Sequence, residues 1–170
     1  MKALIASTLL IVPLAAFSAD KSPDAAFYKH AAEGGISEVE LGTLAQDKAT
    51  SQDVKDFAAM MVKDHGAADD KLKTIADSKS IALPNGASIG DIAIKAKLNV
   101  LSGETFDKSY IKSQLKAHRE AIALFRQEAS SGQDPDAKAF AAATLPTLRE
   151  HLKAIRRVAA SAGMSSKKSA

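Results

Sequence analysis

The chain has 170 residues, enough for one domain with a hydrophobic core, and its charges nearly balance, with 23 Lys and Arg against 20 Asp and Glu. It contains no cysteine. That absence excludes disulfides, and it excludes a lipid anchor of the bacterial kind, which needs a cysteine just after an apolar leader.

Residues 1–19 have the layout of a secretory signal peptide. A short basic start precedes an apolar run over residues 3–17, and small residues follow it. The run is short for a membrane span and contains Pro13, so an uncleaved anchor is disfavoured. We expect cleavage after Ser18 or Ala19, an exported periplasmic protein, and no later membrane span. An exported chain whose basic residues lack interleaved aromatic residues is not expected to bind nucleic acid.

Four long helices are predicted, because the chain is rich in Ala, Lys, Asp and Leu and poor in β-branched and aromatic residues. Their expected bounds are Ser22-Pro23 to about Ala49, Thr50 or Ser51 to about Lys79, Ser102 to Ser130, and Asp134-Pro135 to about Ala162. A capping residue followed by proline marks the first and fourth starts, and Gly132 ends the third helix. Gly34-Gly35 predicts a kink or a close helix approach, and Pro146 predicts a kink in the fourth helix.

The connections between these helices define the fold class. Two are short, around Thr50 and residues 131–133, so each closes an antiparallel hairpin. The connection over residues 80–101 is long; LPNG breaks it, and IGDIAIKAKLNVL predicts a short amphipathic helix. Two hairpins joined by one long crossover are the ferritin-like form of the all-α four-helix bundle. The expected organisation is a signal peptide at 1–19, the bundle at 20–165 and a basic disordered tail at 166–170.

A short internal repeat supports two related hairpins. DVKDFAA at 53–59 matches DAKAFAA at 136–142 in five of seven positions, and each stretch opens the second helix of its hairpin. A true repeat and the shared use of common helix-forming residues explain this match equally well.

One ionisable residue interrupts the apolar stripe of each long helix. Counting in alternating steps of three and four residues finds these interruptions, in chain order, at Glu38, His65, His118 and His151. Each lies roughly 18–28 Å from a hairpin end in helices about 40 Å long, so all four fall near mid-height. Burying one unpaired ionisable group costs several kcal/mol, so four groups at one level have to satisfy one another.

A metal ion would satisfy all four groups. Neutral imidazole and carboxylate are ligands for zinc, manganese, iron or copper, so the pattern predicts one transition-metal ion held by these four side chains. Asp64, Asp69 and Glu150 are placed to orient the rings from a second layer. The alternative is a buried network of His and Glu hydrogen bonds without metal. His30 lies off the stripes and is expected to face solvent.

Several stretches resemble one bacterial family. GGISEVELGTLA, FAAMMVKDH, SGETFDKSYIKSQLKAHREAIALF and LPTLREH are similar to the exported family known as domain of unknown function 4142, over roughly residues 24–160. The resemblance implies a ferritin-like fold and no defined activity, and family members are often labelled outer-membrane proteins. Ferritin-like two-metal proteins carry ExxH pairs, whereas Val62, Leu115 and Leu148 stand three residues before the histidines. A mononuclear, histidine-rich site therefore suits this chain better.

Two functions of different classes follow from these patterns. The first is a periplasmic metal-binding bundle, either a carrier or a small redox enzyme that acts on peroxide or oxygen species. The second is a non-catalytic envelope or stress module that binds an envelope protein and whose core histidines are structural or respond to pH. A cavity beside the cluster would favour the first, and a filled core the second. The sequence leaves the metal, the substrate, the partner and the oligomeric state open.

Overall fold

The computed structural model of the protein describes residues 24–164 and contains five α-helices in that part of the chain. Their bounds are α1 Ala25–Lys48, α2 Gln52–Ser78, α3 Ile89–Asn99, α4 Gly103–Ser131 and α5 Pro135–Ser161. The predicted signal peptide and basic tail lie outside the described residues. None of the described helices combines the length and apolar character that crossing a membrane requires.

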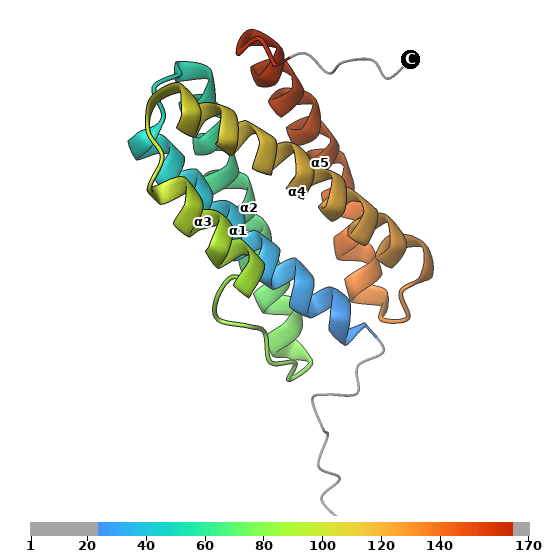
Figure 1. Cartoon of the computed structure of the whole chain (residues 1–170). Coiled ribbons are helices and arrows are strands. Elements are labelled where there is room, and N and C mark those ends of the chain that lie inside the picture. The colour runs from blue at the N-terminus through green and yellow to red at the C-terminus, as the bar shows by residue number, and fades with distance from the viewer. Residues whose placement is uncertain (1–23, 165–170) are drawn as a thin grey trace, which may run out of the picture.

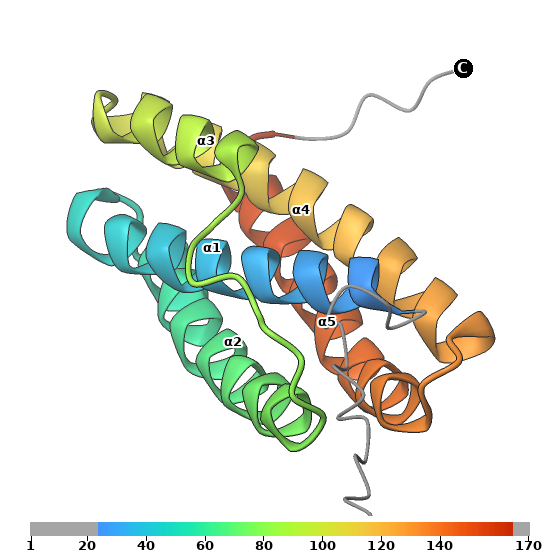
Figure 2. The same cartoon turned by 90° about the horizontal axis from the view of Figure 1, so that it is seen from below.

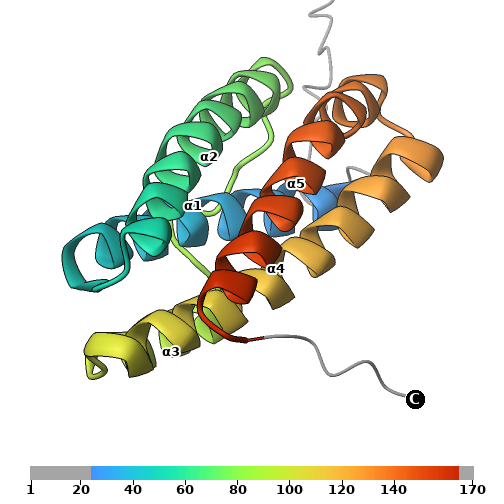
Figure 3. The same ribbon diagram turned by 90° about the horizontal axis from the view of Figure 1, so that it is seen from above.

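The four long helices form two antiparallel hairpins, α1–α2 and α4–α5, which pack with α1 beside α4 and α2 beside α5 (Figure 1). The chain passes between the hairpins through α3, which packs on α1 and α4. Figures 2 and 3 show α3 on the side of the bundle opposite to α2 and α5. This arrangement confirms the predicted all-α four-helix bundle with a long crossover and a short extra helix, and it is compatible with ferritin-like connectivity.

The core consists of two hydrophobic clusters, one toward each end of the bundle. One cluster contains Phe27, Phe125 and Phe140, whose rings lie 5.1–6.3 Å apart. The other contains Phe57 and Phe106. Each long helix contributes residues to both clusters. On each of these helices at least one polar residue lies between the two sets. These positions, which form a polar layer at mid-height, are Glu38, His65, Gln114, His118 and His151.

The predicted helix bounds agree with the structure to within about two residues. α1 begins at Ala25 rather than at Pro23, which lies outside the described residues, and its N-cap is Asp24. α5 begins as predicted at Pro135, after an Asp134 side chain that accepts a hydrogen bond from the next turn. α5 continues through Pro146, and the kink expected there stays a prediction. α3 is helical as predicted but buries only Leu98 of its own residues.

Two buried aspartates tie each hairpin to the turn of the other. Asp24, just before α1, accepts hydrogen bonds from the backbone N–H groups of Gln133-Asp134 in the α4–α5 turn, at 2.9 and 2.6 Å. Asp107, in the first turns of α4, accepts from the N–H groups of Thr50-Ser51 in the α1–α2 turn, at 3.1 and 2.9 Å, and from the Thr50 hydroxyl at 2.6 Å. These contacts fix the height of one hairpin against the other.

The same contacts support the internal repeat. Asp24 and Asp107 are separated by 83 positions, which is also the spacing between the two matching heptapeptides. Ser80 and Gly163, again 83 positions apart, follow the second helix of each hairpin with positive φ angles of 56° and 68°. Shared helix propensity does not explain a common spacing of caps and turns, so two related hairpins are the better interpretation.

α1 and α2 approach closely where α1 carries glycine. A Cβ atom added at Gly42 would lie 2.9 Å from the backbone oxygen of Ala58, and one added at Gly35 would overlap the Asp69 carboxylate. One added at Gly34 would meet nothing within 4 Å. The close approach predicted at Gly34-Gly35 is therefore made by the second glycine of the pair and, two turns later, by Gly42.

We predict opposite effects for alanine at two glycines of α1. Gly42→Ala should lower the free energy of unfolding by about 1–3 kcal/mol, because the added methyl group meets the backbone of α2. Gly34→Ala should raise it by about 0.5–1 kcal/mol, because alanine is the better helix former and has room. Urea denaturation of both variants measures these changes. Shifts of the same sign would contradict the close packing at Gly42.

We also predict that Asp107→Ala lowers the free energy of unfolding by about 2–3 kcal/mol, because three hydrogen-bond donors lose a charged acceptor. Asp47→Ala is the matched control, because Asp47 is exposed and its side chain makes no hydrogen bond or ion pair within residues 24–164; its effect should stay within about 0.5 kcal/mol. Urea denaturation at neutral pH compares the two. Equal effects of the two substitutions on the free energy of unfolding would show that the hydrogen bonds to Asp107 add nothing to stability.

Candidate metal centre

Three of the four predicted residues meet at the centre of the bundle. His65 from α2, His118 from α4 and His151 from α5 each place one ring nitrogen within 4.8 Å of the other two. The three ring centroids are 5.3–5.7 Å apart. His118 and His151 are 1% and 2% exposed, and His65 is partly buried. The mid-height estimate from the sequence therefore located the three imidazoles correctly.

Hydrogen bonds on the outer side of two rings fix which nitrogen carries the proton. His118 Nδ1 lies 3.0 Å from the carbonyl oxygen of Gln114, which can only accept, so Nδ1 carries the hydrogen and Nε2 keeps a lone pair. His151 Nε2 lies 3.0 Å from the Asp64 carboxylate, which by the same logic leaves Nδ1 with the lone pair. Asp64 thus occupies the orienting position that the sequence predicted for it.

The other nitrogens of these rings have no hydrogen-bond partner among residues 24–164. His65 Nε2, His118 Nε2 and His151 Nδ1 are all buried and make no hydrogen bond. An unsatisfied buried acceptor costs about 1–3 kcal/mol. A transition metal bound at about 2.0–2.1 Å from each nitrogen would bring the three to roughly 3.4 Å apart. Ring nitrogens that lie up to 4.8 Å apart would therefore have to approach one another by up to about 1.4 Å to share one ion.

Burial keeps these imidazoles neutral. It lowers the pKa of His65 to about 3, with the two neighbouring histidines adding to the effect. Burial also lowers the pKa of His118 to about 4 and shifts the pKa of His151 downward, against the raising effect of Asp64. Neutral imidazole is the form that binds a metal ion, so the cluster is in a ligating state at neutral pH.

Glu38, the fourth predicted residue, lies beside the cluster rather than within it. Its Oε1 is 3.9 Å from His118 Nδ1, and its Oε2 accepts a hydrogen bond from Gln114 Nε2 at 2.7 Å. Burial raises the pKa of Glu38 to about 7, although the Gln114 hydrogen bond opposes this shift. Glu38 is 6% exposed, so it is a buried carboxyl next to the outer nitrogen of a cluster ring.

The pattern in the sequence does not single out Gln114 of this layer or the nearby Tyr110. A step of three residues back from His118 gives Leu115, which is only partly buried, whereas a step of four gives Gln114, which is fully buried. Tyr110 is also fully buried, and its hydroxyl makes no hydrogen bond to the described residues. Burial raises the pKa of Tyr110, with the charge of Glu38 adding. Tyr110, Gln114 and His118 recur every four residues, and that spacing was the available signal.

A cavity of about 380 Å³ lies beside the cluster. His65, His118 and Glu38 line it, so two of the three imidazoles and the buried carboxyl face the same space. Asp69 lines it as well and, rather than contacting a ring, packs over Gly35 of α1. Burial raises the pKa of Asp69 to about 7, with the charge of neighbouring Asp70 adding. The core is therefore not filled at this point.

The remaining sequence predictions concern residues at the surface. His30 faces solvent as expected; its side chain is 58% exposed and lies 3.5 Å from Glu33, at the rim of the cavity. Glu150, predicted to orient a ring, is instead exposed, and its carboxylate lies 3.7 Å from Lys153. It points away from the cluster because it precedes His151 by one residue, which on a helix is a different face.

The fold and this cluster define a helical-bundle protein with a candidate metal centre. The chain belongs to the family described as domain of unknown function (DUF4142), which matches residues 12–158. No curated protein matches the chain. The family assignment confirms the resemblance found in the sequence.

Three solved structures have a similar fold. A DUF305 protein from Streptomyces coelicolor, described as secreted, is 15% identical with a TM-score of 0.72, over 86% of this chain and 95% of that one. A DUF305 fragment from Deinococcus radiodurans is 13% identical with a TM-score of 0.73, over 82% and 97%. CopM, in a silver-bound form, is 14% identical with a TM-score of 0.66, over 81% and 96%. At these identities the likeness shows the fold alone.

We predict that His65→Leu weakens the dependence of stability on pH between about pH 6.5 and pH 4. In this range the unfolded chain protonates His65 while the folded protein keeps it neutral, so the contribution of His65 lowers stability as pH falls. Leucine removes this difference, which is worth at most about 1.4 kcal/mol per pH unit. Glu38 and Asp69, whose pKa values are raised, act in the opposite direction in both proteins. Urea denaturation across this range, with a chelator present, compares the slopes; identical slopes would contradict a neutral His65.

Proposed function

We propose that the protein binds one transition-metal ion at the centre of the bundle, with His65, His118 and His151 as ligands. The proposal is carried by two observations: the three histidines each bring a ring nitrogen within 4.8 Å of the other two, and each has a buried ring nitrogen with no hydrogen-bond partner in the described residues. Neutral imidazoles suit zinc, iron and copper, and manganese becomes suitable when a carboxylate joins them. One ion would satisfy all three nitrogens at once, which no single hydrogen-bond donor in the described residues does.

Glu38 is the fourth ligand in this proposal. It lines the same cavity as His65 and His118, and it would reach the ion by giving up its hydrogen bond to Gln114. Three neutral imidazoles do not offset the charge of a buried cation, whereas a carboxylate does. A cation beside a buried carboxyl also favours its ionised form.

The cavity favours a metal site that a small molecule can reach. Its volume of about 380 Å³ lies in the range of small-molecule sites and exceeds what one ion needs. This supports a carrier, or a small redox enzyme acting on peroxide or oxygen species, over an interaction module with purely structural histidines. A structural network would be expected to fill its core and to pair its ring nitrogens with donors.

Two of the similar structures support the remaining parts of this proposal. CopM is found in a silver-bound form, so a bundle of this fold is known with a metal ion. The Streptomyces protein is described as secreted, which agrees with the signal peptide predicted here at residues 1–19. We infer an exported protein that works in the periplasm or at the outer membrane.

Thermal melting with added metal tests the proposal. At about pH 7.5, and at a metal concentration about 1,000 times the Kd, the bound ion should stabilise the folded protein by about 4 kcal/mol. For a domain of this size that corresponds to a rise in melting temperature of roughly 8–16 °C. Zinc, manganese, copper and ferrous iron are tested in turn. Near pH 5.5 the rise should shrink, because burial raises the pKa of Glu38 to about 7 and its carboxyl group has to lose a proton before it can bind the ion.

His65→Leu and His30→Leu are the matched variants in this measurement. Leucine suits the apolar stripe at position 65 but removes a ligand, so the metal-induced rise should disappear. His30 is exposed and outside the cluster, so its variant should keep the full rise. If no metal raises the melting temperature of the wild type, or if both variants show the same metal-induced rise, the proposed metal site is wrong.

A further inference from the structure

Acidic side chains line the cavity, and no lysine or arginine of the described residues accompanies them. No lysine or arginine within residues 24–164 lines it, although the chain as a whole has more basic than acidic residues. The carboxylic acids that line it are Glu33, Glu38, Asp69, Asp91 and Glu120. This selection of acidic residues from a mixed surface indicates a site that attracts positive charge.

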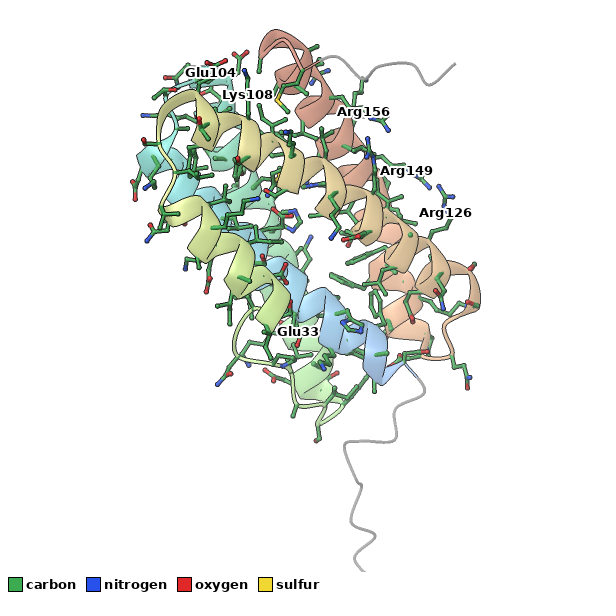
Figure 4. All side chains as sticks on the ribbon, viewed as in Figure 1. Glu33, Glu104, Lys108, Arg126, Arg149 and Arg156 are labelled. Carbon is green, nitrogen blue, oxygen red and sulfur yellow. The ribbon has the colours of Figure 1, made fainter. Side chains whose placement is uncertain are left out.

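These acidic residues are spread from the rim of the cavity to its inner end. At the rim, the side chain of Glu120 is 66% exposed and that of Glu33 is 15% exposed. Figure 4 shows Glu33 on α1, near the start of α3. At the inner end stand the buried Glu38 and His118, whose Nε2 has no partner. The carboxylates therefore form a path that ends at an unsatisfied ligand atom.

Basic side chains do not cancel this charge. The ion pair between Lys116 and Glu120, at 3.7 Å, joins two exposed side chains and is weak. Arg126, Arg149 and Arg156 lie along the outer edge of α4 and α5, away from Glu33 (Figure 4). A recess with apolar walls focuses the field of the acids that line it, and this raises the local concentration of cations.

We propose that the cavity is the entry path of the metal cation, in which Glu33, Asp91 and Glu120 attract the ion to the rim and Asp69 and Glu38 lead it to the histidines. The inference rests on the proposed function and adds the route and the sign of charge that the site accepts. The same charges disfavour anions, so a second molecule that reaches the metal should be neutral or cationic.

The test is the rate at which Co²⁺ binds to the full chain, followed by stopped-flow absorbance at low ionic strength. The variant combines Glu33→Gln, Asp91→Asn and Glu120→Gln, which neutralise the rim and leave the proposed ligands in place. Asparagine keeps an acceptor for the Ser88 hydroxyl that Asp91 now binds. The association rate should fall at least about tenfold, and the dissociation rate should stay within about twofold. Raising the ionic strength to about 150 mM should slow the wild type more than the variant.

The matched control combines Asp47→Asn, Glu104→Gln and Glu150→Gln, which remove the same charge from exposed positions outside the cavity. Its association rate should stay within about twofold of wild type. Equal slowing in both triple variants would mean that only net charge matters and would overturn the path. A faster dissociation with unchanged association would make the rim acids ligands, which also overturns it. If Co²⁺ binds the wild type no better than His118→Ala, the metal site itself fails, and the path with it.

Discussion

Three clustered histidines, each with a buried ring nitrogen that has no hydrogen-bond partner among the described residues, are the constraint on which this structure depends. Each costs free energy when it is buried unpaired, and the bundle tolerates three of them in one layer. The hydrophobic clusters on either side offset that cost, with aromatic residues such as Phe27 in one and Phe57 in the other. The residues that stabilise the fold thus lie toward the two ends of the bundle, and the polar cluster lies between them.

The internal repeat explains both how the layer is assembled and why a cavity lies beside it. The hydrogen bonds of Asp24 and Asp107 to the turns of the opposite hairpins set the two hairpins at matching heights. Residues at mid-height of both hairpins therefore meet. At the repeat spacing of 83 positions, His118 and His151 of the second hairpin correspond to Gly35 and Ala68 of the first. Gly35 and Ala68 both line the cavity. The imidazoles therefore come mainly from one repeat, and the space comes from small residues in the other.

Much of this could be predicted from the sequence because it depends on helix geometry alone. The rise per residue and the positions of two short turns placed His65, His118 and His151 at one height. Counting in threes and fours leaves a one-residue ambiguity, so the periodicity does not decide between Leu115 and Gln114 as the buried residue before His118. The hydrogen bonds of Asp24 and Asp107 depend on contacts between segments that are distant in the sequence. The cavity depends on small side chains that leave space unfilled. Neither leaves a periodic signal in a single sequence.

Elemental analysis of the protein isolated from its native compartment, without chelators, tests the central claim most directly. The account predicts close to one transition-metal ion per chain in the wild type. It predicts none in a triple variant that combines His65→Leu, His118→Leu and His151→Leu. The identity of the ion would also select among zinc, manganese, iron and copper. Wild-type protein that is isolated folded and free of metal, or a triple variant that keeps its metal, would contradict the account.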